Sequence, residues 1–268
     1  MELTHLIFLI PLFLSIGSFS SVVIYRLIAI EFSNTDINLF LPRSHCPKCK
    51  KNISFINLIP LVGYLLQKGR CMNCEKVISY KYPLYELMHL ITGLFIYLNF
   101  GINLISALIY ILFTIFYILF ECDLQKLFLP FYLNILISIF GFSIAFNGTI
   151  FHIESFGILT TSQFILSIYG FIGGYFILWF INICYKFLKE KDGIGGGDFL
   201  LLGGIGSLVG PFSLAPIIFI GSISTLFLAF CCKLNTSEEL PLGSGLIVGL
   251  GIYLLARFFE LSLHGLVI

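Results

Sequence analysis

Long apolar runs are the feature that most constrains how this chain can fold. A helix that crosses the hydrocarbon core of a bilayer needs about 20 predominantly apolar residues. Hydrophobic residues make up 58% of the chain and charged residues 11%, far fewer charges than a soluble domain carries. The pattern predicts an all-α protein that crosses the membrane repeatedly. The candidate spans are Leu6–Ile28, Leu84–Phe100, Leu104–Phe120, Leu129–Phe146, Phe164–Leu188, Leu214–Cys232 and Leu242–Leu263.

The segment Phe199–Val209 is also apolar, but it is short and rich in glycine. We interpret it as an eighth, short span or as a re-entrant segment, which is tolerated only where protein or a water-filled cavity covers it. We expect the first run to be retained rather than cleaved as a signal peptide, because basic residues follow it instead of preceding it.

Lysine and arginine fall on alternate loops. Nine of the 15 lie between Arg26 and Lys81, and most of the others follow the third, fifth and seventh spans. The loop Asn147–Thr161 and the turns near Gly101 and Gly210 contain none. With eight crossings, all the basic loops lie on one side, which the positive-inside rule makes the cytoplasm. Both termini are then predicted to lie outside.

The only long polar segment carries two Cys-x-x-Cys pairs, with 21 residues between the pairs. Four thiolates on two tight turns match the tetrahedral geometry of a structural zinc site, and a small domain of this size needs such a staple. Two disulfides are the alternative, which a reducing cytoplasm disfavours. His45 is a weaker substitute ligand. We predict a zinc-binding loop domain over residues 30–83, after a first transmembrane helix (1–29) and before a seven-helix membrane domain (84–268). The predicted zinc ligands are Cys46, Cys49, Cys71 and Cys74.

Two aspartates stand out among the acids that border apolar runs, where charge is costly and often functional. Asp123 lies at the cytoplasmic end of the third span, and Asp198 lies at the cytoplasmic start of the short span. Two close carboxyl groups share a proton, so one can act as a base while the other acts as an acid. Such a pair can hydrolyse a peptide without a covalent intermediate. We expect Gly195 and Gly197 to allow close backbone approach and positive φ beside the acid.

Simpler interpretations of both aspartates remain open at this stage. Asp198 could be a helix N-cap, because aspartate is a favoured capping residue. Asp123 could be an interfacial acid paired with Lys126. Neither role forbids catalysis.

With these residues in view, the sequence resembles the type IV prepilin peptidases, which are leader peptidases and N-methyltransferases. Five segments carry the resemblance, and the two Cys-x-x-Cys pairs together with "GGGDF" are its most specific part. The segments are Gly17–Leu27, Leu41–Leu87, Asp123–Pro130, Gly195–Phe199 and Leu240–Leu246.

The resemblance implies that Asp123 and Asp198 are the catalytic aspartates of a GxGD-type membrane peptidase in the bacterial inner membrane. Its substrates would be prepilins or pseudopilins with a short basic leader, cut on the cytoplasmic side, and nucleic acid would not be a partner. S-adenosylmethionine would donate a methyl group to the new N-terminal amine. The basic zinc-binding loop would house that activity, and Glu86 would be a candidate residue for it.

The chain also departs from the family pattern. Members commonly carry asparagine at Ser21, lysine at Leu200, an acid at Phe131 and proline at Ser244. None of these changes removes an inferred catalytic group. The main alternative function is a peptidase of the same family without methyl transfer. A membrane transporter or a non-catalytic scaffold is a weaker alternative.

Overall fold

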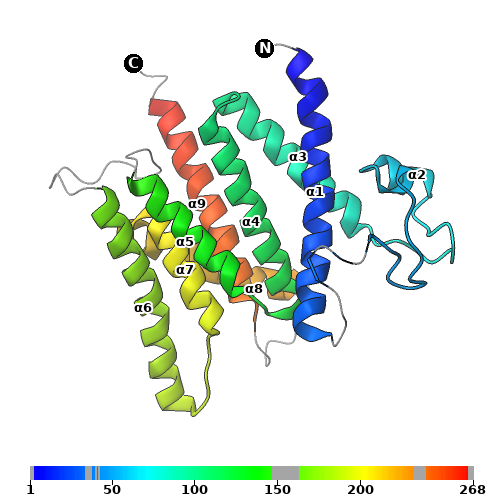
Figure 1. The fold of residues 1–268 in the computed structure, drawn as a ribbon. Coiled ribbons are helices and arrows are strands. Elements are labelled where there is room, and N and C mark those ends of the chain that lie inside the picture. The colour runs from blue at the N-terminus through cyan, green and yellow to red at the C-terminus, as the bar shows by residue number, and fades with distance from the viewer. Residues whose placement is uncertain are drawn as a thin grey trace. The chain divides into compact units, whose positions relative to one another are not determined.

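The computed structural model describes residues 3–33, 38–39, 41, 43–146, 163–231 and 240–264, and these residues form helices joined by loops (Figure 1). This architecture confirms the all-α prediction. In chain order the elements are α1 (Leu3–Phe32), the 3₁₀ helix η1 (Ile56–Leu58), α2 (Val62–Leu66), α3 (Lys81–Phe100), α4 (Leu104–Lys126), α5 (Phe131–Phe146), α6 (Gln163–Lys189), α7 (Gly196–Val209), the 3₁₀ helix η2 (Pro211–Ser213), α8 (Leu214–Cys231) and α9 (Leu242–His264).

Each predicted apolar run is a helix. Helices α1, α4, α6, α8 and α9 are long and apolar enough to cross a membrane, whereas α5 and α7 are apolar but shorter. The number of crossings and their orientation stay predictions. Cys232 and the loop 147–161 lie outside the described residues.

The chain divides into two compact units, Met1–Ile118 and Leu119–Ile268. In the N-terminal unit, α1 packs against α3. The His89 side chain on α3 is fully buried there, with Nδ1 2.9 Å from the Tyr85 carbonyl oxygen and Nε2 3.1 Å from Oγ of Ser20 on α1. The rings of Tyr110 and Tyr117 on α4 lie around this imidazole, so the polar contact joins α3 to α1 and the aromatic contacts join α3 to α4.

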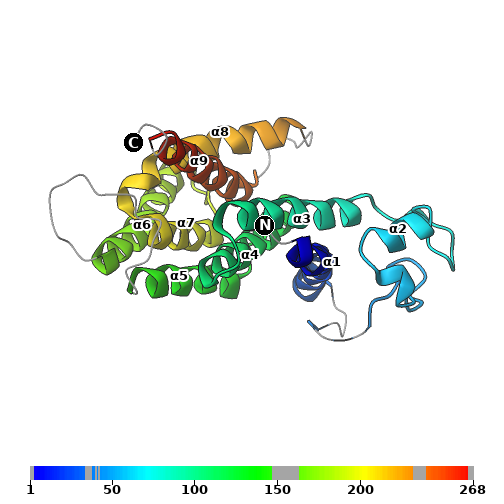
Figure 2. The same cartoon turned by 90° about the horizontal axis from the view of Figure 1, so that it is seen from above.

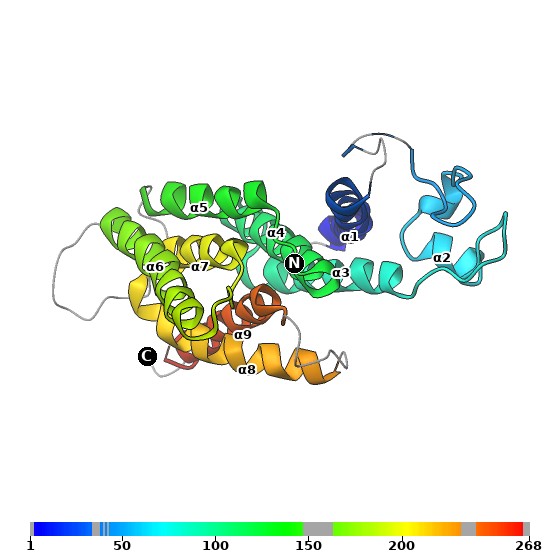
Figure 3. The same ribbon diagram turned by 90° about the horizontal axis from the view of Figure 1, so that it is seen from below.

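In the C-terminal unit, α7 packs against both α5 and α6, and α8 pairs with α9 (Figures 2 and 3). Eleven of the fourteen residues of α7 are buried. A helix of this length spans only about 21 Å, less than the hydrocarbon thickness of about 30 Å. Protein therefore covers a segment that is too short to be an ordinary lipid-facing span.

Small residues bring α6 and α7 into backbone contact. A Cβ atom added at Gly170 on α6 would lie 2.0 Å from the carbonyl oxygen of Gly206 on α7, and one at Gly174 would lie 2.4 Å from the Leu202 carbonyl oxygen. Close packing of this kind drives helix association inside membranes, where lipid is as apolar as the helix faces. The spacing of Gly170 and Gly174 therefore explains how α7 lies flush against its neighbour.

We predict that Gly170→Ala destabilises the protein, whereas Gly173→Ala does not. Both changes favour the helix locally by about 1 kcal/mol, but a Cβ at Gly173 meets only Cδ1 of Leu214, at an ordinary 3.4 Å. Overpacking at Gly170 should cost about 1–3 kcal/mol and lower the thermal midpoint by several degrees. Thermal unfolding in detergent measures the difference. Equal midpoints for the two variants would contradict the packing described for α6 and α7.

Candidate active site

Two helix ends in the C-terminal unit carry the two aspartates identified in the sequence. Asp123 lies in the last turn of α4, and Asp198 is the third residue of α7. Their side chains are only 4% and 9% exposed. Burial of two carboxyl groups is costly unless they share a proton or accept hydrogen bonds.

Gly243, in the first turn of α9, brings the two carboxyl groups into one space. A Cβ atom at this position would lie 3.1 Å from Oδ1 of Asp198 and 3.2 Å from Oδ2 of Asp123. The two oxygens are therefore no further apart than the sum of these distances. Any side chain at Gly243 would fill the space between them, and it would also lie 2.8 Å from Cδ1 of Leu129. Sequence patterns could not predict this contact, because Gly243 is 45 residues from Asp198 and 120 residues from Asp123.

The two carboxyl groups have different surroundings. Oδ2 of Asp123 accepts hydrogen bonds from the backbone N–H of Ser244, at 2.5 Å, and from its hydroxyl, at 2.7 Å. Oδ1 of Asp198 is buried and has no hydrogen-bond partner within the described part of the chain. The pair is thus asymmetric, with a doubly bonded oxygen on one acid and an unpartnered oxygen on the other.

The expectation of positive φ at Gly195 and Gly197 is wrong. Gly195 is the N-cap of α7 with an extended backbone (φ −72°, ψ 147°), and Gly197 is helical. Their contribution is close approach, because a Cβ at Gly197 would lie 2.9 Å from Cβ of Leu129. The N-cap interpretation of Asp198 is also wrong, because Gly195 occupies that position.

The loop that leads into α7 is held by Asn182 on α6. Oδ1 of Asn182 accepts hydrogen bonds from the backbone N–H groups of Gly193 and Ile194, at 2.8 and 3.0 Å, and its amide donates to Asp192. Lys186 donates to the other oxygen of Asp192, and with the Asn182 amide it holds the pKa of that carboxyl below its usual range. These bonds fix the loop that precedes Asp198. The role of Asn182 was not predicted, and the sequence signal that could have indicated it is an asparagine within an apolar run.

The four predicted cysteine ligands converge in the N-terminal unit. Their sulfur atoms all lie within 4.8 Å of one another, with Cys46 and Cys74 at 3.9 Å. A metal bound to four thiolates at about 2.3 Å with tetrahedral geometry separates the sulfurs by about 3.8 Å, so this cluster can hold a metal ion. None of the described cysteines forms a disulfide. His45 lies outside the cluster, with Nδ1 2.9 Å from the Arg43 carbonyl oxygen.

Backbone amides favour the thiolate form at one of these ligands. The N–H of Cys49, with a smaller contribution from that of Lys48, lowers the pKa of the Cys46 thiol to about 7. A metal ligand must be deprotonated, so these amide groups favour the ligand form of Cys46.

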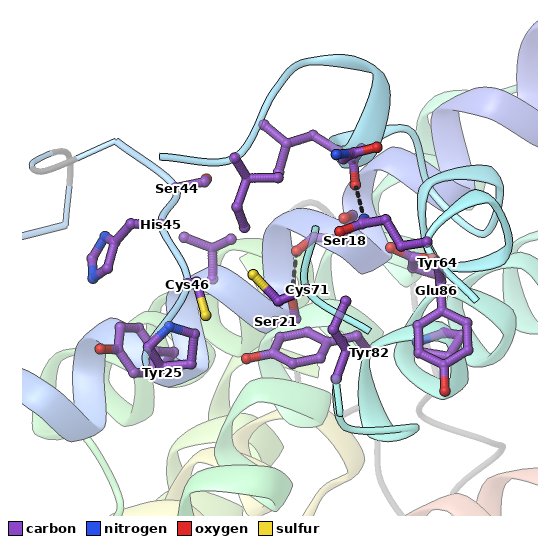
Figure 4. Close-up of a pocket in the computed structure, with 18 of the residues that line it drawn as sticks. Ser18, Ser21, Tyr25, Ser44, His45, Cys46, Tyr64, Cys71, Tyr82 and Glu86 are labelled. Atoms are coloured by element: carbon purple, nitrogen blue, oxygen red, sulfur yellow. Dashed lines mark hydrogen bonds between the residues drawn. The ribbon is translucent and has the colours of Figure 1, made fainter. Parts of the chain in front are cut away.

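A cavity of about 190 Å³ lies beside the cysteine cluster in the same unit. Residues from α1, from the cysteine-bearing loop and from the start of α3 line it. Figure 4 shows Cys46 and Cys71 near one another, with Tyr64 and Glu86 further along the same cavity. Its polar and aromatic lining includes Ser18, Ser21, Tyr25, Arg26, Ser44, His45, Asn57, Tyr64, Gln67, Tyr82 and Glu86.

Glu86 is a buried carboxyl group in the wall of this cavity. It is 7% exposed, and its Oε2 accepts a hydrogen bond of 2.7 Å from the backbone N–H of Leu61. Leu61 has φ 58° and ψ −50°, a backbone conformation that branched apolar residues rarely adopt. Backbone strain of this kind persists only where the surrounding structure enforces it, and it is most frequent at functional sites.

Comparison with known proteins identifies the chain's relatives. The bacterial peptidase A24 N-terminal domain matches residues 12–100, and the type IV leader peptidase family matches residues 107–230. A prepilin leader peptidase/N-methyltransferase of Neisseria gonorrhoeae is 31% identical over 88% of this chain and 85% of its own length. The protein of the same name from Vibrio cholerae is 31% identical over 98% of this chain and 100% of its own. No solved structure matches.

The chain belongs to the type IV leader peptidase family. This membership confirms the resemblance noted from the sequence. A third relative, a type 4 prepilin-like proteins leader peptide-processing enzyme of Escherichia coli, is 33% identical over 91% of this chain and 92% of its own length. The N-terminal match covers the cysteine cluster and Glu86, and the second match covers both aspartates.

We predict that Cys71→Ser lowers the amount of copurifying metal from about one ion per chain to a small fraction, because three thiolates bind far more weakly than four. Cys184→Ser is the matched control, since Cys184 is exposed on α6 and outside the cluster. Elemental analysis of the two purified variants measures the change. Full metal occupancy in Cys71→Ser would rule out the four-cysteine site.

Proposed function

We propose that this protein is a membrane aspartic endopeptidase that removes the leader of type IV prepilins or pseudopilins, with Asp123 and Asp198 as its catalytic pair. The observation that carries the proposal is the convergence of one oxygen from each aspartate on the space beside Gly243. Family membership supports the substrate class, since the relatives are prepilin leader peptidases.

In the proposed reaction one aspartate is ionised and the other is protonated, because a close pair shares a proton. The carboxylate takes a proton from water as the water oxygen bonds to the scissile carbonyl carbon. The protonated carboxyl group transfers its proton to the carbonyl oxygen, which gives a gem-diol. On collapse, one diol hydroxyl returns its proton to the second aspartate, the amide nitrogen takes a proton from the first, and the C–N bond breaks. Both aspartates then regain their starting states.

The proposed site of cleavage is the cytoplasmic face of the inner membrane. The alternation of lysine and arginine supports this placement, since it puts the end of α4, the start of α7 and the cysteine-bearing loop on the same side. A substrate with a polar leader ahead of an apolar helix would meet the dyad at the junction of the two segments.

We predict that Asp123→Asn and Asp198→Asn each lower kcat/KM for leader removal by at least about 10³-fold, because neither variant can complete the proton exchange. The double variant should lose little more than either single one, since residues that act as a unit are not additive. Glu190→Gln, a neutralised acid exposed in the loop before α7, is the control. Cleavage of a prepilin by purified protein measures the rates. Wild-type leader cleavage by either aspartate variant would contradict the proposed catalytic pair.

We also propose that the cavity beside the cysteine cluster is the site of N-methylation, with zinc as the structural metal of that cluster. The methyl donor of the family is S-adenosylmethionine, which supplies an electrophilic methyl group on a sulfonium cation. The residues fit such a cation, because the rings of Tyr25, Tyr64 and Tyr82 and the Glu86 carboxyl group line the cavity. The names of the relatives, which include N-methyltransferase, favour this second activity.

Within that site we assign Glu86 to the substrate amine. The N-terminal amine released by cleavage is protonated near neutral pH and has no free electron pair in that form. The Glu86 carboxylate can bind the ammonium group and accept its proton, which leaves the amine nucleophilic. The hydrogen bond from the Leu61 N–H holds one carboxylate oxygen, and the Ser18 side chain also donates to the carboxyl group, so these donors orient Glu86 in the cavity wall.

We predict that Glu86→Gln lowers the rate of N-methylation by about 10²-fold and leaves leader cleavage within about twofold, because glutamine keeps the size but cannot accept a proton. Glu75→Gln, an exposed acid in the same loop, is the control. Mass spectrometry of the new N-terminus, with and without S-adenosylmethionine, reports both activities. Wild-type methylation by Glu86→Gln would refute the role of Glu86, and a wild-type protein that cleaves without methylating would be a peptidase only.

A further inference from the structure

Ser244 holds one oxygen of the aspartate pair with two donors. Its backbone N–H lies 2.5 Å and its hydroxyl 2.7 Å from Oδ2 of Asp123. The hydroxyl is also 3.1 Å from the carbonyl oxygen of Phe120, so its single proton is divided between two acceptors. The N–H belongs to the first turn of α9, where backbone donors have no partner within the helix. Asp123 thus receives a hydrogen-bond donor that helix geometry alone leaves unused.

These donors favour a negative charge on Asp123. Hydrogen bonds to an ionised acceptor are about twice as strong as those to a neutral one, and the start of a helix carries partial positive charge. Asp198 lacks a comparable partner on Oδ1, which is buried without a hydrogen bond within the described residues. The backbone N–H groups of Gly195 and Gly243 lie near its carboxyl group, but they leave that oxygen unsatisfied. An unsatisfied buried oxygen costs less on a neutral carboxyl group than on an anion.

We propose that Ser244 is a positioning residue that places the negative charge of the pair on Asp123 and the shared proton on Asp198. This inference rests on the proposed peptidase function and assigns the two roles that it leaves open. Asp123 then takes the proton from water, and Asp198 gives its proton to the scissile carbonyl oxygen.

Other titratable groups near Asp123 come from α4 and α7. Glu121, Cys122 and Lys126 share its helix, and Asp198 faces it from α7. Glu121 accepts a hydrogen bond from Gln125 at 2.7 Å. The sequence of α9 from Leu242 to Leu255 contains no charged residue. The Ser244 variants below therefore change the donors to Asp123 and leave every titratable group in place.

Substitutions at Ser244 can remove its two donors together or one alone. Proline has neither an N–H nor a hydroxyl, so Ser244→Pro removes both donors to Asp123. Ser244→Ala removes only the hydroxyl, and Ser244→Thr keeps both groups. The three variants form a graded series at a position near the start of a helix, where proline is tolerated.

The test is the pH dependence of kcat/KM for cleavage of a prepilin by the full-length purified protein. Each lost donor makes ionised Asp123 harder to form, so the acidic limb of the profile should move to higher pH. We expect a shift of about one pH unit for Ser244→Pro, a smaller shift for Ser244→Ala and none for Ser244→Thr. Ser222→Ala on α8, which removes an exposed serine hydroxyl, should also leave the profile unchanged.

Two controls separate the possible failures. Thermal midpoints of all variants are measured alongside the profiles, because a merely structural role would change stability without moving the acidic limb. If Ser244→Ala and Ser244→Pro keep the wild-type limb, the inference about Ser244 is overturned while the peptidase proposal stands. If Asp123→Asn and Asp198→Asn still cleave, the peptidase proposal itself fails.

Discussion

The backbone contact between α6 and α7 is the constraint on which the rest of the C-terminal unit depends. Gly170 and Gly206 approach so closely that neither has room for a side chain. This contact, with the packing of α5 on the other side, lets a helix of fourteen residues be enclosed by protein. The enclosed helix carries Asp198 in its first turn, so the position of one carboxyl group of the proposed catalytic pair follows from the packing of α6 against α7.

Two buried carboxyl groups would ordinarily oppose this fold, since each loses its hydration on burial. The structure offsets the cost unequally. Asp123 accepts two hydrogen bonds from Ser244, whereas Asp198 keeps an oxygen without a partner in the described residues. Gly243 completes the arrangement by leaving open the space that both acids face. The two neighbouring residues in the first turn of α9 therefore contribute in different ways. Ser244 donates hydrogen bonds to Asp123, and Gly243 leaves space because it has no side chain.

Period and spacing in the sequence predicted the helices and the cysteine cluster, because these features depend on residues near one another in the chain. The two aspartates stood out because they border apolar runs, and their expected role came from the resemblance to the prepilin peptidases. The contributions of Gly243, Ser244 and Asn182 could not be predicted in the same way. Gly243 and Ser244 act on aspartates at least 45 residues away, and only the packing of α9 brings them there. The prediction of positive φ at Gly195 was wrong for a different reason. Glycine is common both in left-handed turns and at extended N-cap positions, so the residue type alone does not tell the two conformations apart.

The enclosure of α7 has a consequence for how the chain enters the membrane during synthesis. With eleven of fourteen residues buried, α7 offers little surface to lipid and is too short to span the bilayer as an independent helix. It should therefore be inserted together with α6, as a hairpin whose glycine contacts form before or during release into the bilayer. The loop held by Asn182 joins these two helices, so the same bonds that place Asp198 in the finished enzyme would also close that hairpin early in biogenesis.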